Sequence, residues 1–538
     1  MKQMLRFSLF TSLLSVAACV AGHSSPTSPV PPAHVEPSGS TASRDVRANA
    51  GSDDGVALFE TLVRMVRRYH LFAPQTEQNL GKRWDDDLPR LRAEFAAAKT
   101  PEALTVAAWH FGNSLHDVHC RFHPKDRGDR LRLGFRVGVE KQGTGFQFYV
   151  ERVSDEGLKK ALTPGDLVVR VDGVPASKLL EEYELSSNMN SFDNIALEIA
   201  AFLTSRRTSN TLVRPGTTSS WVVQPRGGGA TKTFTAQWKK SSPAEDGDFA
   251  IDYENKDCVN ADPKDYGPYQ IAARGYRVCI YTSTAPTYRD YPIVRHVSFR
   301  YDEFPHGPLA DYDLIQSLLA RAKPKGVLLD VQDNGGGMNP NVFLEWWTDK
   351  PYTDTSTRML LDDELLRDET GEAHISSLND AVRTWYAREL QQRAPGQRIS
   401  SPRPFMCKPN TCDWENRYTP RHRVTLAPVA LLLGPGCASS CDALAWHFEK
   451  TRIGPLVGRV PMAGFTTHRA RFDVVSHQGQ PALGRIDFAI SYDTPPGRTE
   501  SIEGTYVHLD VPIARTFENF NRYDALLVDG AIRQLQSR

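Results

Sequence analysis

The chain has 538 residues, which is too long for a single ordinary domain and suggests about three. Hydrophobic residues make up 40% of the chain and charged residues 24%, as in soluble globular proteins. Lys and Arg together number 64, as do Asp and Glu, so the net charge does not argue for a nucleic-acid partner or an anionic surface. The composition therefore predicts a soluble multidomain protein that does not bind nucleic acid.

The N-terminal residues are typical of an export signal. Lys2 and Arg6 precede an apolar run at residues 7–18 that is too short to span a bilayer. We interpret residues 1–18 as a signal peptide and residues 19–52, which are rich in Ser, Pro, Gly and Ala, as a lipidated cysteine followed by a flexible linker.

The end of that apolar run, Val-Ala-Ala-Cys, resembles a bacterial lipobox, in which the cysteine is lipidated and becomes the new N-terminus. Membrane contact is then expected only through a lipid anchor on Cys19, with the protein facing the periplasm or the cell exterior. An ordinary signal peptide cleaved nearby is the alternative. Both interpretations predict an exported protein, which can keep disulfides.

The cysteine count is odd once Cys19 is set aside, so at least one thiol is unpaired or bonded elsewhere. The expected disulfides are Cys407–Cys412, Cys258–Cys279 and, on weaker grounds, Cys437–Cys441. A spacing of four is poor disulfide geometry in a helix, which is why the last pair is weakly predicted. Cys120 is then left over. A zinc site is the rival explanation, but no CxxC pair with matching histidines occurs.

Residues 53–125 are predicted to form an N-terminal helical region. Apolar residues recur at helical intervals in three stretches, and Pro101 and Glu102 are typical of the start of the third. That helix should end before residues 116–122, which carry His116 and His119.

Residues 130–240 change to the alternating pattern of strands, with Gly-rich turns between them. Gly165-Asp166 followed by Val171-Asp172-Gly173 resembles the signature of a PDZ domain, a module that binds extended peptides by adding a strand to a sheet edge. A helix-like insert at residues 193–206 interrupts this PDZ-like β domain. A small β-barrel that acts only as a spacer is the alternative.

Residues 275–538 follow an α/β order, with a linker predicted before them at residues 240–275. Strands are expected at residues 276–281, 325–331, 429–433, 455–458, around Phe488 and at 506–510, and helices at 314–322, at 442–450 and at the C-terminus. Residues 350–425 are mostly polar and predict a long insertion without a clear core pattern. In such sheets the loops at the carboxyl ends of strands carry the site.

Two loops of this kind stand out. Gly335-Gly336-Gly337 follows the strand ending near Val331, and Ser439 stands where the strand at 429–433 turns into a helix. The unpaired N–H groups at a helix start can hold the negative oxygen of a tetrahedral intermediate, which suits a nucleophile. The alternative is that Ser439 or Ser440 merely caps the helix.

Together these pieces resemble the C-terminal processing peptidases (tail-specific proteases) and their tricorn-core relatives. The residues that carry the resemblance are Asp330, Asn334 and Gly335-Gly336 at the strand end, and Ala438-Ser439 with Asp442 where the family has Glu. The resemblance implies a serine peptidase core with a crotonase-like α/β sheet, beside the PDZ-like domain and the helical region. It assigns the nucleophile to Ser439.

The resemblance also bears on the general base. The processing peptidases use a lysine after a Thr-x-Gly turn, but Gly464 stands at that position here, and nearby Arg459 stays protonated. The tricorn-like branch uses a histidine in a Leu-x-Asp-x-His segment, which matches residues 115–119 and implies His119, with His116 as a rival. The relay serine that precedes this histidine in archaeal tricorn protease is replaced by Val118.

The branch's acidic residue corresponds to Glu503, which would orient the imidazole directly or through an intermediary. The oxyanion would be held by backbone N–H groups of Gly336, or its Gly neighbour, and Ser440. The chain is thus predicted to be an exported lipoprotein serine endopeptidase that cleaves peptides or proteins and requires no metal or organic cofactor.

Two other functions remain open on the sequence. One is a catalytically degenerate family member that acts as a PDZ-type peptide-binding envelope lipoprotein. The other is an enzyme that uses Cys120 or Cys441 as its nucleophile with His119.

Overall fold

A computed structural model describes residues 46–47, 54–241, 258, 264–301, 307–366, 380–407, 411–412, 415–466, 468–476 and 481–538. The predicted signal peptide and lipid-modified Cys19 lie outside these ranges, as does nearly all of the predicted N-terminal linker. None of the helices in the described ranges is both long enough and apolar enough to cross a membrane.

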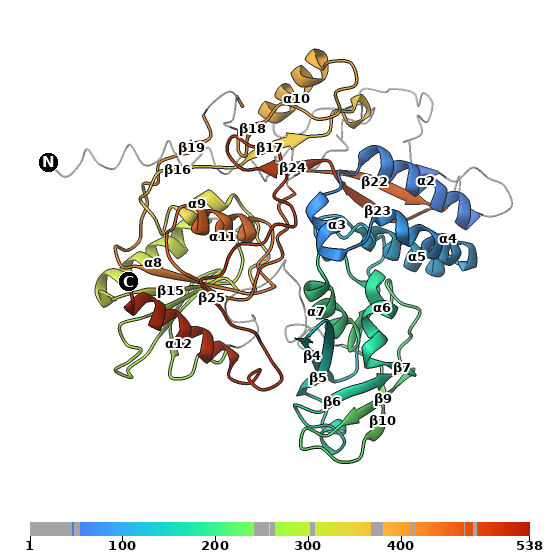
Figure 1. The fold of residues 1–538 in the computed structure, drawn as a ribbon, viewed down its shortest axis with the longest axis horizontal. Coiled ribbons are helices and arrows are strands. Elements are labelled where there is room, and N and C mark those ends of the chain that lie inside the picture. Colours follow the sequence, from blue (N-terminus) through green and yellow to red (C-terminus); the bar gives the residue numbers. More distant parts are fainter. Residues whose placement is uncertain are drawn as a thin grey trace, which may run out of the picture.

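Four helices form the N-terminal region, where the sequence predicted three, and they share a core with two strands from the far end of the chain (Figure 1). Phe111 on the last helix is buried with Phe122, Phe472 and Phe488. The region is therefore not a separate domain. The helices are α2 (Asp54–Tyr69), α3 (Pro74–Leu80), α4 (Leu88–Ala97) and α5 (Pro101–Asn113), and the sheet has the order β1 (Val46–Arg47), β22 (Arg469–Val475), β23 (Ala482–Ala489), β2 (Phe122–Pro124).

The antiparallel pairing of β2 with β23 matters for the site. Phe122 lies opposite Ile486, which fixes the turn between α5 and β2 against the C-terminal part of the chain. That turn carries His119. It is held further by Asn188, whose Nδ2 donates to the carbonyl oxygens of Asp117 (2.9 Å) and Cys120 (3.1 Å).

Residues 130–240 form the predicted β-rich module, at the bottom right of Figure 1. Its main sheet has the order β10-β9-β6-β5-β4, so β4 is at one edge, and the helix in the predicted insert packs on β4. The strands are β3 (Arg130–Arg132), β4 (Phe135–Gln142), β5 (Gly145–Val153), β6 (Leu167–Val171), β7 (Val174–Pro175), β8 (Ser205–Arg207), β9 (Thr218–Gln224), β10 (Lys232–Gln237) and β11 (Lys239–Lys240), and the helices are α6 (Leu179–Tyr183) and α7 (Phe192–Phe202).

The core sheet has seven strands in the order β12-β13-β14-β15-β20-β21-β25. From β14 to β25 each neighbouring pair is parallel, and Asp330 on β15 lies opposite Leu432 on β20. The strands are β12 (Gln270–Arg274), β13 (Val278–Thr282), β14 (Ile293–His296), β15 (Val327–Asp330), β20 (Val429–Leu433), β21 (Leu456–Gly458) and β25 (Val511–Pro512).

Because β15 and β20 are parallel neighbours, the loops that follow them emerge at the same edge of the sheet. Strand β20 is buried on both faces, since Leu431 and Leu433 pack in one hydrophobic cluster and Ala430 and Leu432 in another. The surrounding helices are α8 (Leu309–Ala322), α9 (Pro340–Leu344), α11 (Ser440–Lys450) and α12 (Tyr523–Gln536).

Three sequence predictions about this region are wrong. The strand expected at residues 506–510 is instead β25, which follows it, and β12 forms within the expected linker at residues 240–275. The insertion at residues 350–425 does contain core residues. It forms β16 (Tyr352–Thr353), β17 (Ser356–Met359), α10 (Asp380–Gln392), β18 (Arg403–Pro404) and β19 (Arg417–Tyr418), and β17 pairs with β24 (Ser491–Thr494).

The buried side chains of the insertion join the N-terminal helices rather than the core sheet. Met359, Leu361, Trp385 and Tyr386 all belong to the cluster that contains α2 and α5. Because their partners are hundreds of residues away, local periodicity does not show that they are buried.

We expect Trp385→Ala to lower the free energy of unfolding by about 3–5 kcal/mol, since it empties a buried site for a large side chain. Arg383→Ala, at an exposed position on the same helix, should change it by less than about 0.5 kcal/mol. Denaturant unfolding, followed by far-UV circular dichroism, measures the free energy of unfolding of both variants. Equal effects of the two variants would contradict the placement of α10.

Candidate active site

The turn between β20 and α11 that carries Ser439, called the Ser439 corner below, has a strained backbone. Strand β20 ends at Leu433 and helix α11 begins at Ser440, so Ser439 stands at the predicted strand-to-helix turn. Its backbone has φ 60° and ψ −122°, a conformation that costs a non-glycine residue about 1–3 kcal/mol. The surroundings must therefore hold it in place.

Asp442, on the first turn of α11, supplies part of that hold. Its fully buried carboxylate accepts hydrogen bonds from the backbone N–H groups of Ser439 (2.9 Å), Ala463 (2.8 Å) and Gly464 (3.0 Å). Burial raises the pKa of Asp442 to about 8, while these three donors stabilise its ionised form. One buried carboxyl group thus ties the Ser439 backbone to residues 463–464, and these three hydrogen bonds are called the Asp442 clamp below.

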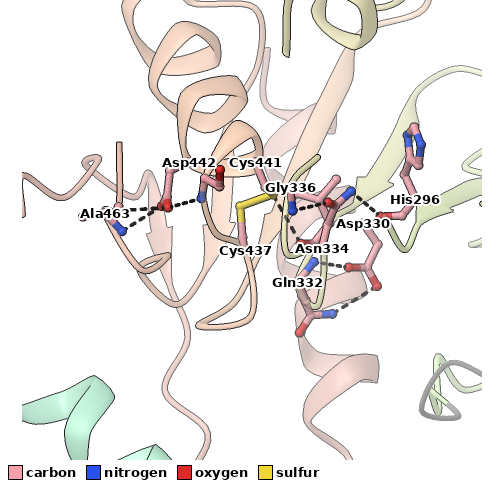
Figure 2. The surroundings of a disulfide bond; sticks show 12 residues. His296, Asp330, Gln332, Asn334, Gly336, Cys437, Cys441, Asp442 and Ala463 are labelled. Carbon is pink, nitrogen blue, oxygen red and sulfur yellow. Dashed lines mark hydrogen bonds between the residues drawn. A yellow bond between two sulfur atoms is a disulfide. The ribbon is translucent and has the colours of Figure 1, made fainter. Parts of the chain in front are cut away.

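A disulfide joins Cys437 to Cys441 across the same corner (Figure 2). The Cα atoms are 5.2 Å apart, within the normal range for a disulfide. Cys437 precedes α11, so the helical spacing that argued against this pair does not apply. The two other expected disulfides, Cys258–Cys279 and Cys407–Cys412, are also present, and Cys120 is free.

The Gly-rich loop after β15 lies directly against the corner. A Cβ atom added to Gly336 would be 2.6 Å from the Ala438 carbonyl oxygen and 2.8 Å from both Ser439 Cβ and Ser440 N. Gly336 also has φ +86°, so only glycine fits this approach without strain. The Ser440 hydroxyl donates to the Gly337 carbonyl at 3.1 Å, which joins the loop to the start of α11.

The Asn334 side chain holds the Gly-rich loop in place through two hydrogen bonds, as Figure 2 shows. Its buried side chain donates to the His296 carbonyl (2.9 Å) and accepts from the Gly336 N–H (2.9 Å). The Gly336 N–H, which the sequence proposed as an oxyanion donor, is thus engaged in this structure. The Ser440 N–H, at the first position of α11, belongs to the group that has no acceptor within a helix.

His119 is on the α5–β2 turn and reaches the corner through Gly464. A Cβ atom added to Gly464 would be 3.4 Å from His119 Cε1 and only 1.9 Å from Val118 Cγ2. The N–H of Gly464 donates to Asp442, which also holds Ser439. The structure therefore brings His119 to the segment that is clamped to Ser439.

The same contact leaves no room for a side chain at position 464. A side chain at position 464 would run into Val118 beside the imidazole, so a lysine at position 464 and the Val118–His119 turn exclude each other sterically. Burial, together with the charges of Arg469 and Arg121, lowers the pKa of His119 to about 3 and keeps its ring neutral at physiological pH. Its Nδ1 is buried and has no hydrogen-bond partner among the described residues.

Glu503 lies in the same buried region. One of its carboxyl oxygens accepts from the Phe465 N–H (2.5 Å), and the other, Oε1, is buried without a partner among the described residues. Burial, with the nearby Asp117 charge, raises the pKa of Glu503 well above its ordinary value. Glu503 Oε1 and His119 Nδ1 are thus two buried polar atoms without a hydrogen-bond partner in the described part of the chain.

One residue that the sequence did not single out, Thr466, completes this region. Thr466 Oγ1 is 3.4 Å from Glu503 Oε2 and 3.5 Å from Asp117 Oδ2, and Asp117 Oδ1 accepts from the His119 N–H at 2.9 Å. Thr466 thus places a hydroxyl beside the acid, although Val118 stands where the tricorn relay serine was expected. The sequence signal that could have pointed to Thr466 is its position two residues after Gly464.

The rival candidates do not fit. Cys441 is bonded to Cys437 and has no free thiol. Cys120 is fully buried, and burial raises the pKa of its thiol well above the ordinary value, which suppresses the reactive thiolate. The buried His116 ring is bonded through Nδ1 to the Met189 carbonyl at 3.0 Å.

One buried cluster of metal-type donors is present in the described part of the chain. His70, Asp117 and Cys120 place their donor atoms within 4.8 Å of one another. His70 Nδ1 accepts from the Ala489 N–H (3.3 Å), so in the neutral ring the other nitrogen carries the proton and is not free to bind a metal. The cluster is therefore better suited to hydrogen bonding.

We expect Asp442→Ala to lower the free energy of unfolding by at least about 3 kcal/mol, because three buried N–H groups lose their acceptor. Amide hydrogen exchange at Ser439, Ala463 and Gly464 should become faster. Asp442→Asn, which keeps one acceptor oxygen, should have a smaller effect, and Asp473→Ala, at an exposed site, almost none. Unchanged exchange at all three amides in Asp442→Ala would refute the clamp.

Several solved protein structures are similar to this chain. No family model matches the chain, and no curated protein matches it by sequence. The structure of mature CPAF complexed with lactacystin is 15% identical, with 90% of this chain and 99% of that chain covered, at a TM-score of 0.65. Mature CPAF alone gives 15% identity, the same 90% coverage here with 98% there, and a TM-score of 0.64.

The photosystem II D1 C-terminal processing protease is also similar, at 14% identity over 90% of this chain and 98% of that one, with a TM-score of 0.39. The agreement with CPAF runs through the helical region, the β-rich module and the core sheet, since it covers nine-tenths of the chain. The chain therefore has the mixed α/β fold of mature CPAF.

Proposed function

We propose that the chain is a serine peptidase in which Ser439 is the nucleophile and His119 the general base. The observation that carries the proposal is the clamp at Asp442, which joins the strained Ser439 backbone to Gly464, the residue against which His119 packs. The similarity of the fold to mature CPAF and the motif resemblance at residues 330–337 and 438–442 support it.

In the proposed reaction, His119 removes the proton of the Ser439 hydroxyl as the oxygen attacks the scissile carbonyl carbon. The tetrahedral intermediate carries its negative charge on the former carbonyl oxygen. His119 then passes the proton to the departing amine as the C–N bond breaks, and water, activated by the same imidazole, releases the acyl group from Ser439.

The oxyanion donors are proposed to be the N–H groups of Ser440 and Gly337. Ser440 offers the first N–H of α11, and the Gly337 carbonyl accepts from its hydroxyl, which brings Gly337 to the corner. The assignment moves from Gly336 to its neighbour because Asn334 occupies the Gly336 N–H.

Glu503 is proposed to act on the other side of His119. Its Oε1 and His119 Nδ1 are each buried without a partner among the described residues, and a buried polar atom in that state costs about 1–3 kcal/mol. A link between them, direct or through an intermediary, would satisfy both and would hold the imidazole in its orientation. Thr466 would help to position the acid.

The proposal includes a route by which the peptide reaches the site and a cellular location for the protein. Strand β4 is at a sheet edge beside α7, an arrangement that suits addition of an extended peptide in a PDZ-like manner. The core sheet is proposed to be crotonase-like. The signal-like residues 1–18 and Cys19 support an exported lipoprotein, and the three disulfides accord with an oxidising compartment.

We expect a fluorophosphonate probe to label the wild-type protein covalently and to leave Ser439→Ala unlabelled. His119→Gln should slow labelling by about a hundredfold to ten-thousandfold, the usual contribution of a general base. The wild type should also digest denatured casein, and Ser439→Ala should not. Gel fluorescence and peptide mass spectrometry provide the two readouts.

Ser317→Ala, at an exposed position on α8, and His116→Gln are the matched controls, because each alters the same kind of side chain outside the proposed machinery. Both should keep labelling within about tenfold of the wild type. Lactacystin, with which mature CPAF was solved, should compete with the probe. A folded wild-type protein that the probe does not label would instead favour the peptide-binding alternative.

The pH dependence of labelling gives a separate test. Because burial lowers the pKa of His119 to about 3, its neutral, basic form is present throughout the range above that value. The labelling rate should therefore stay nearly level as the pH falls from 7 to 5. A drop of tenfold or more over this interval, with an apparent pKa near 6.5, would mean that the base is an ordinary exposed imidazole.

A further inference from the structure

Residues 187–191 of the β-rich module, which lead into α7, form a loop that is buried along its whole length. Their sequence is Ser-Asn-Met-Asn-Ser, and each residue is at most 9% exposed. Connecting loops usually run over the protein surface, because buried polar groups need hydrogen-bond partners inside the protein. The partners of these residues, called the 187–191 loop below, therefore indicate what the burial serves.

Asn188 bonds to the turn that carries the proposed base. Its side chain is buried, and its Nδ2 donates to the carbonyl oxygens of Asp117 (2.9 Å) and Cys120 (3.1 Å). These two residues stand on either side of His119 in the sequence. Asn188 thus holds the backbone of the turn both before and after the histidine.

Asn190 bonds to the segment that the Asp442 clamp ties to Ser439. It is fully buried, and its Nδ2 donates to the Ala463 carbonyl at 3.2 Å. The N–H of the same Ala463 donates to Asp442 at 2.8 Å. The Oδ1 of Asn190 accepts from the Tyr506 hydroxyl at 3.2 Å, so both ends of its amide group are engaged.

The 187–191 loop therefore bonds to both halves of the proposed site. The His119 turn and Ala463 are far apart in the sequence, but only one residue separates the two asparagines that hold them. The loop thus sets the spacing between the two segments. A general base must lie within hydrogen-bond reach of the proton that it removes, so this spacing bears on the rate of the proposed reaction.

We propose that Asn188 and Asn190 are positioning residues, Asn188 for the base His119 and Asn190 for the backbone that holds Ser439. Each acts through a main-chain carbonyl oxygen rather than on the substrate. The β-rich module then contributes to the chemistry through this loop, whether or not it binds a peptide. This inference rests on the proposed peptidase function, because it states how the base is held in register with the nucleophile.

The test of Asn188 measures the pKa of His119, which burial and the charges of nearby arginines lower to about 3. Asn188→Ala should loosen the turn and admit water to the imidazole, so this pKa should rise to about 5 or higher. NMR of the full-length protein with ¹³C-labelled histidine measures the pKa without requiring activity, and His119→Gln assigns the signal. The charged groups around the turn, which this variant leaves in place, are Arg121, Arg469, Asp117 and Glu503.

The test of Asn190 measures amide exchange in the segment that it holds. Asn190→Ala should make exchange at the Ala463 and Gly464 N–H groups about tenfold faster, because the segment loses a buried hydrogen bond. It should leave the pKa of His119 near 3, since the bonds of Asn188 remain. Asn188→Ala should show the opposite pattern in these two measurements.

Both variants should also slow the chemical step of labelling by the fluorophosphonate probe. The maximal rate of modification of Ser439 should fall by about tenfold or more, because the base and the nucleophile are no longer aligned. The probe concentration that gives half of this rate should change by less than about threefold, because probe binding is kept. A general loss of folded protein would not produce this division.

Ser219→Ala is the matched control for loss of a buried hydrogen bond in the same module. Ser219 is 1% exposed on β9, and its hydroxyl donates to Asp172 at 2.9 Å. Two strands, β6 and β5, separate β9 from β4, on which α7 packs. This variant should leave the pKa of His119, the exchange at Ala463 and Gly464, and the maximal labelling rate at their wild-type values.

A pKa of His119 that stays near 3 in Asn188→Ala would overturn the role of Asn188, and unchanged exchange in Asn190→Ala would overturn that of Asn190. If an alanine variant melts below the assay temperature, Asn188→Ser or Asn190→Ser, which keeps a shorter donor, is judged by the same criteria. A wild-type protein that the probe does not label would contradict the proposed peptidase function. The pKa and exchange measurements need no activity, so they decide the positioning separately.

Discussion

One buried carboxylate holds the candidate site together. Asp442 accepts three backbone N–H groups from two separate segments, and it lies at the start of the helix whose first N–H is proposed to hold the oxyanion. Without it, the positive φ of Ser439 would have to be maintained by the disulfide and the Gly-rich loop alone. The position of His119 depends on it as well, since Gly464 packs against that imidazole while donating to Asp442.

The same position shows how the corner tolerates a departure from the family motif. The family has Glu where this chain has Asp442. The shorter side chain reaches its three donors because residues 463–464 lie close to the start of α11, and Ala463 adopts φ 57° to present its N–H. Gly464 has no side chain to fill the space that Val118 and His119 occupy. Asp, Gly and His at these three positions are therefore physically linked choices.

Much of the fold could be predicted from the sequence because its signals were local. Strand β20 has the bounds that its five apolar residues predicted, and the parallel α/β order placed Gly336 and Ser439 at one edge of the sheet. The insertion was missed because Trp385 and Met359 are buried against α2 and α5, far away in sequence. No local pattern reports such a contact.

The candidate site was predictable in part for the same reason. The motifs indicated Ser439, His119 and Glu503, and the structure brings His119 to the segment that Asp442 clamps to Ser439, and Glu503 beside Thr466. Thr466 and the use of the Gly336 N–H by Asn334 depend on side-chain geometry, which spacing does not show. The Cys437–Cys441 disulfide is only weakly predicted by the sequence because a spacing of four is poor disulfide geometry in a helix, whereas α11 begins at Ser440, three residues after Cys437.

The pairing of β2 with β23 has a consequence for the newly made chain. His119 is synthesised early, but its turn is anchored by a strand that begins at Ala482, and Glu503 comes later still. A chain that has formed the Ser439 corner but lacks β23 therefore has neither the proposed base held in place nor the proposed acid. The proposed constellation of Ser439, His119 and Glu503 can therefore assemble only when the chain as far as Glu503 is available for folding, so a shorter chain cannot form the proposed centre.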